Sequence, residues 1–149
     1  MDILKDDKYN FTSGFLGMRV IFHVLAEFGE TQLAYHMITK TEYPSYGYWV
    51  SRNETTLLEQ FRQYDQYYPL SKNHHFLGDV INWFMSKMGG LQVVNSEFVR
   101  VKPNYINGID WCRTTHKLPG GEIEIYWERQ GNKVNLEVNC TGNVRYEVV

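Results

Sequence analysis

The spacing of apolar residues changes near the Gly89–Gly90 pair, and this change constrains the fold more than any other feature. Before the pair, apolar residues recur every three or four positions, which is typical of amphipathic helices. After it, apolar and polar residues alternate, which is typical of half-buried strands. The sequence therefore predicts an α-then-β chain, with helices over residues 1–92 and a small β domain over residues 93–149.

Three helices are expected in the first part. One covers residues 14–28 and ends at Gly29, because glycine adopts the left-handed conformation after a helix at the lowest cost. A second begins at Thr31, and the longest runs from residue 73 or 74 to Lys87, where the two glycines stop it. The predicted inner face of the first helix consists of Leu16, Val20, Ile21, Val24, Leu25 and Phe28.

The segments between these helices are rich in polar and aromatic residues. The run TEYPSYGYWV contains Pro44 and Gly47, which predict a loop. A short helical segment is expected over Thr55–Tyr64, followed by a tyrosine-rich loop that leads to Ser71. Loops on a rigid scaffold are where binding and catalytic residues concentrate. We therefore expect the functional residues between the helices.

The β part should contain five short strands. They are separated by glycine- and asparagine-containing turns, which supply positive φ at low cost and are typical of hairpins. This pattern predicts a small antiparallel β-sandwich or meander. The predicted strands are FVRVKP, IDWCRTTHKL, EIEIYWER, KVNLEVNC and VRYEVV.

Charge and cysteine content exclude several classes of function. Fifteen basic and seventeen acidic residues are well mixed over 149 positions, so nothing indicates a nucleic-acid or anionic-membrane surface. Runs as long as a membrane span and an apolar signal-peptide core are both absent, and the compartment stays open. Cys112 and Cys140 fit neither metal spacing nor a disulfide framework, so we expect free thiols and no metal or other cofactor.

Glu59 is a candidate catalytic residue. In TTLLEQF its neighbours Leu57, Leu58 and Phe61 would partly desolvate the carboxylate, which makes it a better general base. The alternative, a glutamate on the wet side of a short helix, is favoured by spacing alone. Phosphate-loop and nucleophilic serine or cysteine motifs are absent, which argues against those chemistries.

His74 and the aromatic residues are candidates for ligand binding. His74 follows Ser71-x-Asn73 at a predicted helix start, where it could donate to a ligand hydroxyl or make a structural hydrogen bond. The chain has eleven tyrosines, eight phenylalanines and four tryptophans. A ring face can pack on the C–H face of a pyranose, although such rings also serve as core residues. Tyr46 and Trp49 are the aromatic candidates for substrate binding.

The order of short motifs resembles that of the α-L-rhamnosidases of glycoside hydrolase family 78. The series in the first part is TSGFLG, EYPSYGYWV, ETTLLEQF and SKNHHFLGDVINWF, followed by a Gly-Gly turn. The β part continues the series with FVRVKPNY and IDWCRTTHKLPGGEIEIYWE. The resemblance covers almost the whole chain in order, which makes it more specific than any one motif.

This resemblance implies a fold and a reaction. The fold is the last helices of an (α/α)6 toroid followed by a C-terminal β-sandwich. The reaction is hydrolysis of a terminal α-L-rhamnosyl bond with inversion, without a cofactor. The family's Thr-Thr-x-x-Glu motif places the general base on Glu59, and its Ser-x-Asn-His motif places a sugar-hydroxyl ligand on His74. The chain departs from the family at Leu58 and Tyr46, where tryptophan is common, and at Gln60, Phe61 and Arg62, which replace Arg-Trp-Asp. These changes could alter the sugar or aglycone preference.

The resemblance also implies that part of the site is missing. In the family, the general acid comes from an acidic segment upstream of the region that this chain matches. We therefore expect the 149-residue chain to be a piece of a longer enzyme and to be inactive alone. Its expected partners are a rhamnose-containing glycoside and the rest of the catalytic domain, or a second copy through exposed helix faces. The alternatives are a non-catalytic carbohydrate-binding or structural module, and a toroid glycosidase specific for another sugar.

Overall fold

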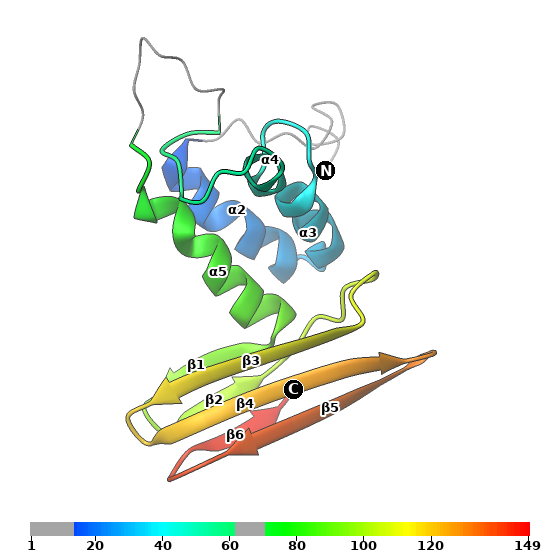
Figure 1. The fold of residues 1–149 in the computed structure, drawn as a ribbon. Helices are drawn as coiled ribbons and strands as arrows, with labels where there is room; N and C mark the ends of the chain where they lie inside the picture. The colour runs from blue at the N-terminus through cyan, green and yellow to red at the C-terminus, as the bar shows by residue number, and fades with distance from the viewer. Residues whose placement is uncertain (1–13, 62–70) are drawn as a thin grey trace. The chain divides into compact units, whose positions relative to one another are not determined.

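The computed structural model describes residues 14–61 and 71–149 (Figure 1). The chain divides into two compact units, one up to Val80 and the other from Ile81. Among the residues that the structure describes, the first unit contains helices and the strands all lie in the second. The predicted order, α then β, is confirmed.

Over residues 14–61 the first unit contains three helices: α2 (Phe15–Glu27), α3 (Thr31–Thr39) and α4 (Tyr46–Ser51). The predicted end of α2 is confirmed, because Gly29 has a φ of 82°. The backbone N–H of Glu30 then donates to the carbonyl of Leu25 at 2.8 Å, which satisfies a carbonyl at the helix end.

The predicted inner face of α2 is largely wrong. The residues that are buried are Met18, Phe22 and Leu25, of which only Leu25 was expected. The helix sequence FLGMRVIFHVLAE carries apolar residues around most of its circumference, so the spacing does not select one face. Four expected core residues are instead exposed: Leu16 (67%), Val20 (55%), Val24 (42%) and Phe28 (82%).

The segment between α3 and Ser71 differs from its prediction. Residues 46–51 form α4 rather than a loop, because the Ser45 side chain caps the helix by accepting from the N–H of Tyr48 at 2.8 Å. The short helix predicted over Thr55–Tyr64 is absent from residues 55–61, and its last three residues lie outside the described part of the chain.

The longest predicted helix is present, but its hydrogen-bond pattern changes along its length. It starts as a 3-10 turn, η1 (His75–Gly78), continues as α5 (Asp79–Trp83) and ends as a π-helical segment, η2 (Phe84–Met88). The N–H of Gly89 donates to the carbonyl of Phe84, five residues back, at 2.8 Å. Gly90 follows with a φ of 82°, so the two glycines end the helix as predicted.

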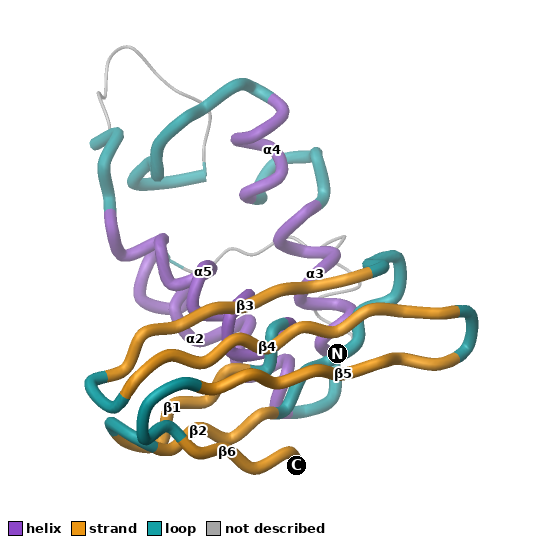
Figure 2. Tube along the Cα trace, turned by 60° about the horizontal axis from the view of Figure 1, so that its bottom comes forward, coloured by secondary structure: helices purple, strands orange, loops and turns teal. Residues whose placement is uncertain are grey.

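The second unit contains two three-stranded sheets, with orders β1-β2-β6 and β3-β4-β5 (Figure 2). One strand, β1, was not predicted, because its residues Val93 and Val94 are both exposed and do not alternate. The all-antiparallel prediction is wrong for one pair, since β2 and β6 are parallel. The strands are β1 (Leu91–Asn95), β2 (Phe98–Val101), β3 (Trp111–Leu118), β4 (Gly121–Gln130), β5 (Lys133–Cys140) and β6 (Arg145–Val148).

The core of the second unit lies between its two sheets. Residues from both sheets contribute, and the indole N–H of the fully buried Trp127 donates to the carbonyl of Met88 at 2.9 Å. Both cysteines are free; Cys112 is buried and Cys140 half-buried, and this burial raises the pKa of both thiols. The buried core residues are Leu91, Val99, Val101, Leu118, Ile123, Ile125 and Val144.

Candidate functional site

Two short segments that carry Glu59 and His74 are hydrogen-bonded to each other. The N–H of Glu59 donates to the carbonyl of Ser71 at 3.0 Å, and the N–H of Ser71 donates back to Oε2 of Glu59 at 3.1 Å. The N–H of His74 donates to the carbonyl of Leu57 at 2.9 Å. These three bonds align residues 57–59 with residues 71–74, so two of the predicted site residues lie on adjoining segments of one unit.

The Glu59 side chain lies at the edge of an apolar region. It is half-buried, while Leu58 and Phe61 on either side of it are buried. The Ser71 N–H orients the carboxylate through Oε2. A half-buried carboxylate held through one oxygen is the kind of group that can act as a general base.

An aromatic cluster lies behind this segment, formed by Phe22, Tyr46, Trp49 and Phe61. The rings of Trp49 and Phe61 are stacked, with centroids 4.4 Å apart and planes 18° from parallel. Tyr46 meets Phe61 edge-to-face, with centroids 4.9 Å apart. Tyr46 and Trp49 are only 9% and 4% exposed, so their ring faces contact other rings of the cluster. The cluster therefore supports the segment that carries Glu59.

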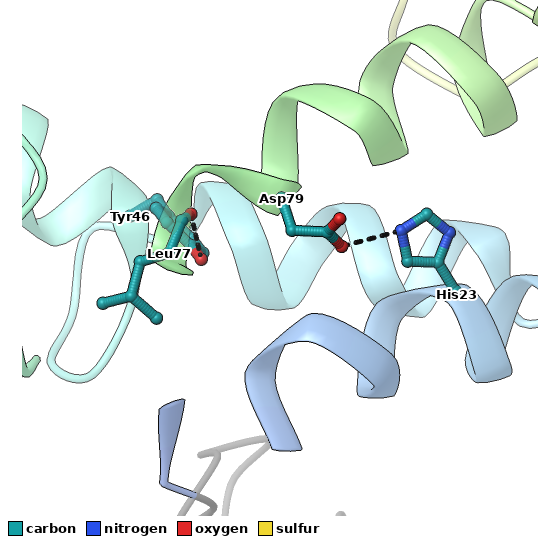
Figure 3. A network of polar contacts seen from close by, with 4 residues as sticks. All are labelled: His23, Tyr46, Leu77 and Asp79. Carbon is teal, nitrogen blue, oxygen red and sulfur yellow. Dashed lines mark hydrogen bonds and ion pairs between the residues drawn. The ribbon is translucent and has the colours of Figure 1, made fainter. Parts of the chain in front are cut away.

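Two polar contacts hold the start of the last helix against α2 and α4 (Figure 3). Nε2 of His23 lies 2.9 Å from Oδ2 of Asp79, and the Tyr46 hydroxyl donates to the carbonyl of Leu77 at 2.9 Å. Both contacts join residues that are far apart in the sequence, so sequence reasoning did not pair them. They fix η1, and with it the position of His74 at its N-terminal end.

His74 occupies the position just before η1, without a capping hydrogen bond from its side chain. Its side chain is half-buried, whereas the side chain of the adjacent His75 is exposed. The ring of Phe76 lies 5.4 Å from that of His74, centroid to centroid. His74 is therefore held by its backbone and by ring contacts on the segment that pairs with Glu59.

Replacing Tyr46 by phenylalanine should lower stability and change its dependence on pH. Loss of the bond to Leu77 should cost about 0.5–1.5 kcal/mol of unfolding free energy. Burial, and to a lesser extent the charge of Asp79, raises the pKa of the Tyr46 phenol. The stabilisation from the neutral phenol is therefore fully present below the pKa of the unfolded chain, about 10, and is lost as the pH rises toward the folded pKa.

Urea unfolding of the wild-type chain and of Tyr46→Phe, at neutral and at alkaline pH, measures both effects. The difference between the two proteins should shrink at alkaline pH. Tyr43→Phe is the matched control, because Tyr43 is 48% exposed in the loop just before α4. If the difference in unfolding free energy between the two proteins did not change with pH, the raised pKa of the Tyr46 phenol would be contradicted.

The described residues contain neither a metal-type cluster nor a membrane-spanning helix. In residues 14–61 and 71–149, no three His, Cys, Asp or Glu side chains are grouped so that they could hold a metal ion. The helices in these ranges are too short or too polar to cross a bilayer.

Comparison with known proteins identifies both parts of the chain. Residues 1–88 match the bacterial α-L-rhamnosidase six-hairpin glycosidase domain, and residues 97–149 match the bacterial α-L-rhamnosidase C-terminal domain. An α-L-rhamnosidase of Alteromonas sp. (strain LOR) is 25% identical over the full length of the chain, which spans 17% of that protein.

Solved structures agree with this match. The α-L-rhamnosidase from Dictyoglumus thermophilum superposes with a TM-score of 0.91 at 27% identity, over 99% of this chain and 17% of its own. The Streptomyces avermitilis α-L-rhamnosidase, solved in complex with L-rhamnose, shares the fold with a TM-score of 0.91 at 22% identity, over 99% of this chain and 15% of its own. The chain belongs to the bacterial α-L-rhamnosidase family, as the end of its six-hairpin glycosidase domain followed by its C-terminal β domain.

Proposed function

We propose that the chain is part of an inverting glycoside hydrolase that removes terminal α-L-rhamnosyl residues, and that Glu59 is its general base. The observation that carries the proposal is the pairing of residues 57–59 with residues 71–74. This pairing holds the Glu59 carboxylate beside the segment of His74. Membership in a glycosidase family supports the reaction class.

The carboxylate would act on a water molecule. Oε1 of Glu59 takes a proton from the water as its oxygen bonds to the anomeric carbon. The bond from this carbon to the leaving oxygen breaks on the opposite face of the sugar, and a carboxylic acid protonates that oxygen. Inverting enzymes hold their two carboxyl groups roughly 6.5–9.5 Å apart so that the water fits between. We assign no general acid to a residue of this chain.

The other predicted site residues divide between two roles. His74 would donate to a sugar hydroxyl from its half-buried position. For Tyr46 and Trp49, direct binding of the substrate remains a prediction. Their burial favours a positioning role, in which the aromatic cluster sets the place of Glu59. Leu58, buried where the family commonly has tryptophan, is the departure most suited to alter specificity for the sugar.

The remainder of the site would come from outside the matched region. The chain spans about 17% of the length of the relatives that it matches. We propose that the general acid lies in the rest of the enzyme. The exposed row of α2 (Leu16, Val20, Val24 and Phe28) gives that remainder, or a second copy, an apolar surface to cover. The division into residues 1–92 and 93–149 also remains a proposal.

The test compares the 149-residue chain with the complete reading frame that encodes it. An aryl α-L-rhamnoside is the substrate, and proton NMR follows the first sugar product before it mutarotates. The complete protein should release the β anomer, as inversion requires, and the chain alone should show no turnover. Release of the α anomer would refute inversion. Turnover by the isolated chain would refute the proposed division of the site. No turnover by a folded complete protein would refute the activity itself.

A further inference from the structure

An open pocket lies in the second unit, on the outer face of the sheet β3-β4-β5. Its volume is about 470 Å³, and it is lined by Trp111, Arg113, Thr115 and Tyr126. This volume is within the range of about 300–1,000 Å³ that is common for small-molecule sites. Figure 2 shows the two strands that supply these residues, side by side in the sheet.

Strand register brings the four lining residues onto one face. Arg113 is paired with Tyr126, and Trp111 and Thr115 lie two positions to either side of Arg113 on β3. Successive side chains of a strand point to opposite faces. The residues between them, Cys112 and Thr114, are accordingly buried. The pocket is therefore built on a hydrogen-bonded sheet rather than on loops.

Trp111 is the unusual member of this set. Its side chain is 61% exposed, whereas the other three tryptophans of the chain are at most 4% exposed. Its ring centroid lies 6.4 Å from that of Tyr126, with an angle of 37° between the planes. Trp111 is the first residue of the edge strand β3, and an indole left in water there has hydrophobic area available for a ligand.

The polar groups around Trp111 are held in place. The Arg113 guanidinium lies 5.1 Å from the ring centroid of Tyr126, and the Tyr126 hydroxyl donates to Oε2 of Glu128 at 2.9 Å. Gln130 donates to the other oxygen of Glu128 at 2.6 Å. A flat aromatic surface with fixed charged and amide side chains beside it is the combination that recognises a sugar ring and its hydroxyl groups.

The charge of the face indicates a neutral ligand. The face carries four acidic residues, Glu122, Glu124, Glu128 and Glu137, against three basic ones, Arg113, Lys117 and Lys133. The ion pair between Arg113 and Glu124 is 3.8 Å long. This excess of negative charge disfavours carboxylate and phosphate ligands. Asn135 and Asn139, paired with Glu128 and Glu124, add neutral hydrogen-bonding groups.

We propose that this pocket is a carbohydrate-binding site, at which a neutral pyranose packs its C–H face on Trp111 and bonds through its hydroxyls to Arg113, Thr115 and the neighbouring carboxylates. The site performs no hydrolysis and does not depend on Glu59. In a glycosidase, such a site would hold a sugar of the substrate away from the reacting bond.

Tryptophan fluorescence of the 149-residue chain tests the proposal, because Trp111 is the only exposed tryptophan. The probes are methyl α-L-rhamnoside and methyl β-D-glucoside, with sodium glucuronate as the anionic comparison. A saturable change in emission is expected with at least one neutral glycoside, and the apparent affinity for glucuronate should be at least tenfold lower. No saturable change with either neutral glycoside, up to its solubility limit, would overturn the proposal.

Calorimetry on variants locates the binding. Trp111→Ala should weaken binding at least tenfold, about 1.4 kcal/mol, while Trp111→Phe should retain most of the affinity. Tyr146→Ala, an exposed tyrosine on the other sheet, and Glu59→Gln should leave the affinity unchanged. Binding that survives Trp111→Ala, or that is lost in Glu59→Gln, would assign the sugar to another site and overturn the proposal. Circular dichroism confirms that each variant is folded.

Discussion

Glu59→Gln, made in the complete reading frame, should lower kcat on an aryl α-L-rhamnoside by about 10²–10⁴-fold. Glutamine has nearly the same size as glutamate. Its amide oxygen can still accept from the Ser71 N–H, so the pairing of residues 57–59 with residues 71–74 should persist. The amide cannot take a proton from water, and the loss should therefore fall on kcat, with KM little changed. Steady-state kinetics measure both constants.

The matched control is Glu54→Gln, a half-buried glutamate on the same stretch of chain. It should retain nearly full activity. Azide, a small nucleophile that does not need the base, should restore turnover to Glu59→Gln and yield a glycosyl azide, which also shows that the variant is folded. A loss of kcat below tenfold, about 1.4 kcal/mol of barrier, would contradict the assignment of Glu59 as the base.

Trp127→Ala should destabilise the second unit by about 3–5 kcal/mol. The indole is fully buried on β4, meets Tyr105 edge-to-face with centroids 5.4 Å apart, and donates to the carbonyl of Met88. Its removal leaves a cavity and a carbonyl without its donor, and these costs add. Urea unfolding followed by circular dichroism measures the difference.

The matched control is Trp111→Ala, the same substitution on the neighbouring strand. Because Trp111 is 61% exposed, its removal should change stability by no more than about 0.5 kcal/mol. Equal losses for the two variants would mean that the two faces of the sheet β3-β4-β5 are wrongly assigned. A small loss for Trp127→Ala alone would show that the core can close around the missing ring.

Local chemistry made the helix ends and the β3-β4-β5 strands predictable. Gly29 and Gly90 end helices with a positive φ, which glycine adopts at the lowest cost. Gly89 stands where no side chain has to be placed. The inner face of α2 could not be predicted, because apolar residues occupy more than one face of that helix. Strand β1 could not be predicted from alternation of apolar and polar residues, because its neighbouring residues Val93 and Val94 are both apolar and both exposed. The parallel β2–β6 pair depends on a long-range return of the chain, which local patterns do not encode.

The candidate site shows the same division. Motif order selected Glu59 and His74; the family match confirms the resemblance, while the roles of these two residues stay predictions. Their backbone pairing through Ser71 and Leu57 joins segments whose partnership no spacing reveals. The His23–Asp79 contact spans 56 positions and has no sequence signal. The burial of Tyr46 and Trp49 follows from ring packing around Phe61, which composition alone cannot distinguish from an open sugar-binding surface.

The parallel pairing of β2 with β6 has a consequence for the order of folding. Paired residues such as Arg100 and Glu147 are 47 positions apart, whereas β3, β4 and β5 are joined by tight hairpins. Closing a long loop costs more entropy than closing a hairpin, so the hairpins should form first. Once strands β3, β4 and β5 have paired, the flexible part of the chain between β2 and β6 is shorter, and the ends of these two strands come together. Strand β6 should therefore be the last strand to gain protection from hydrogen exchange during refolding.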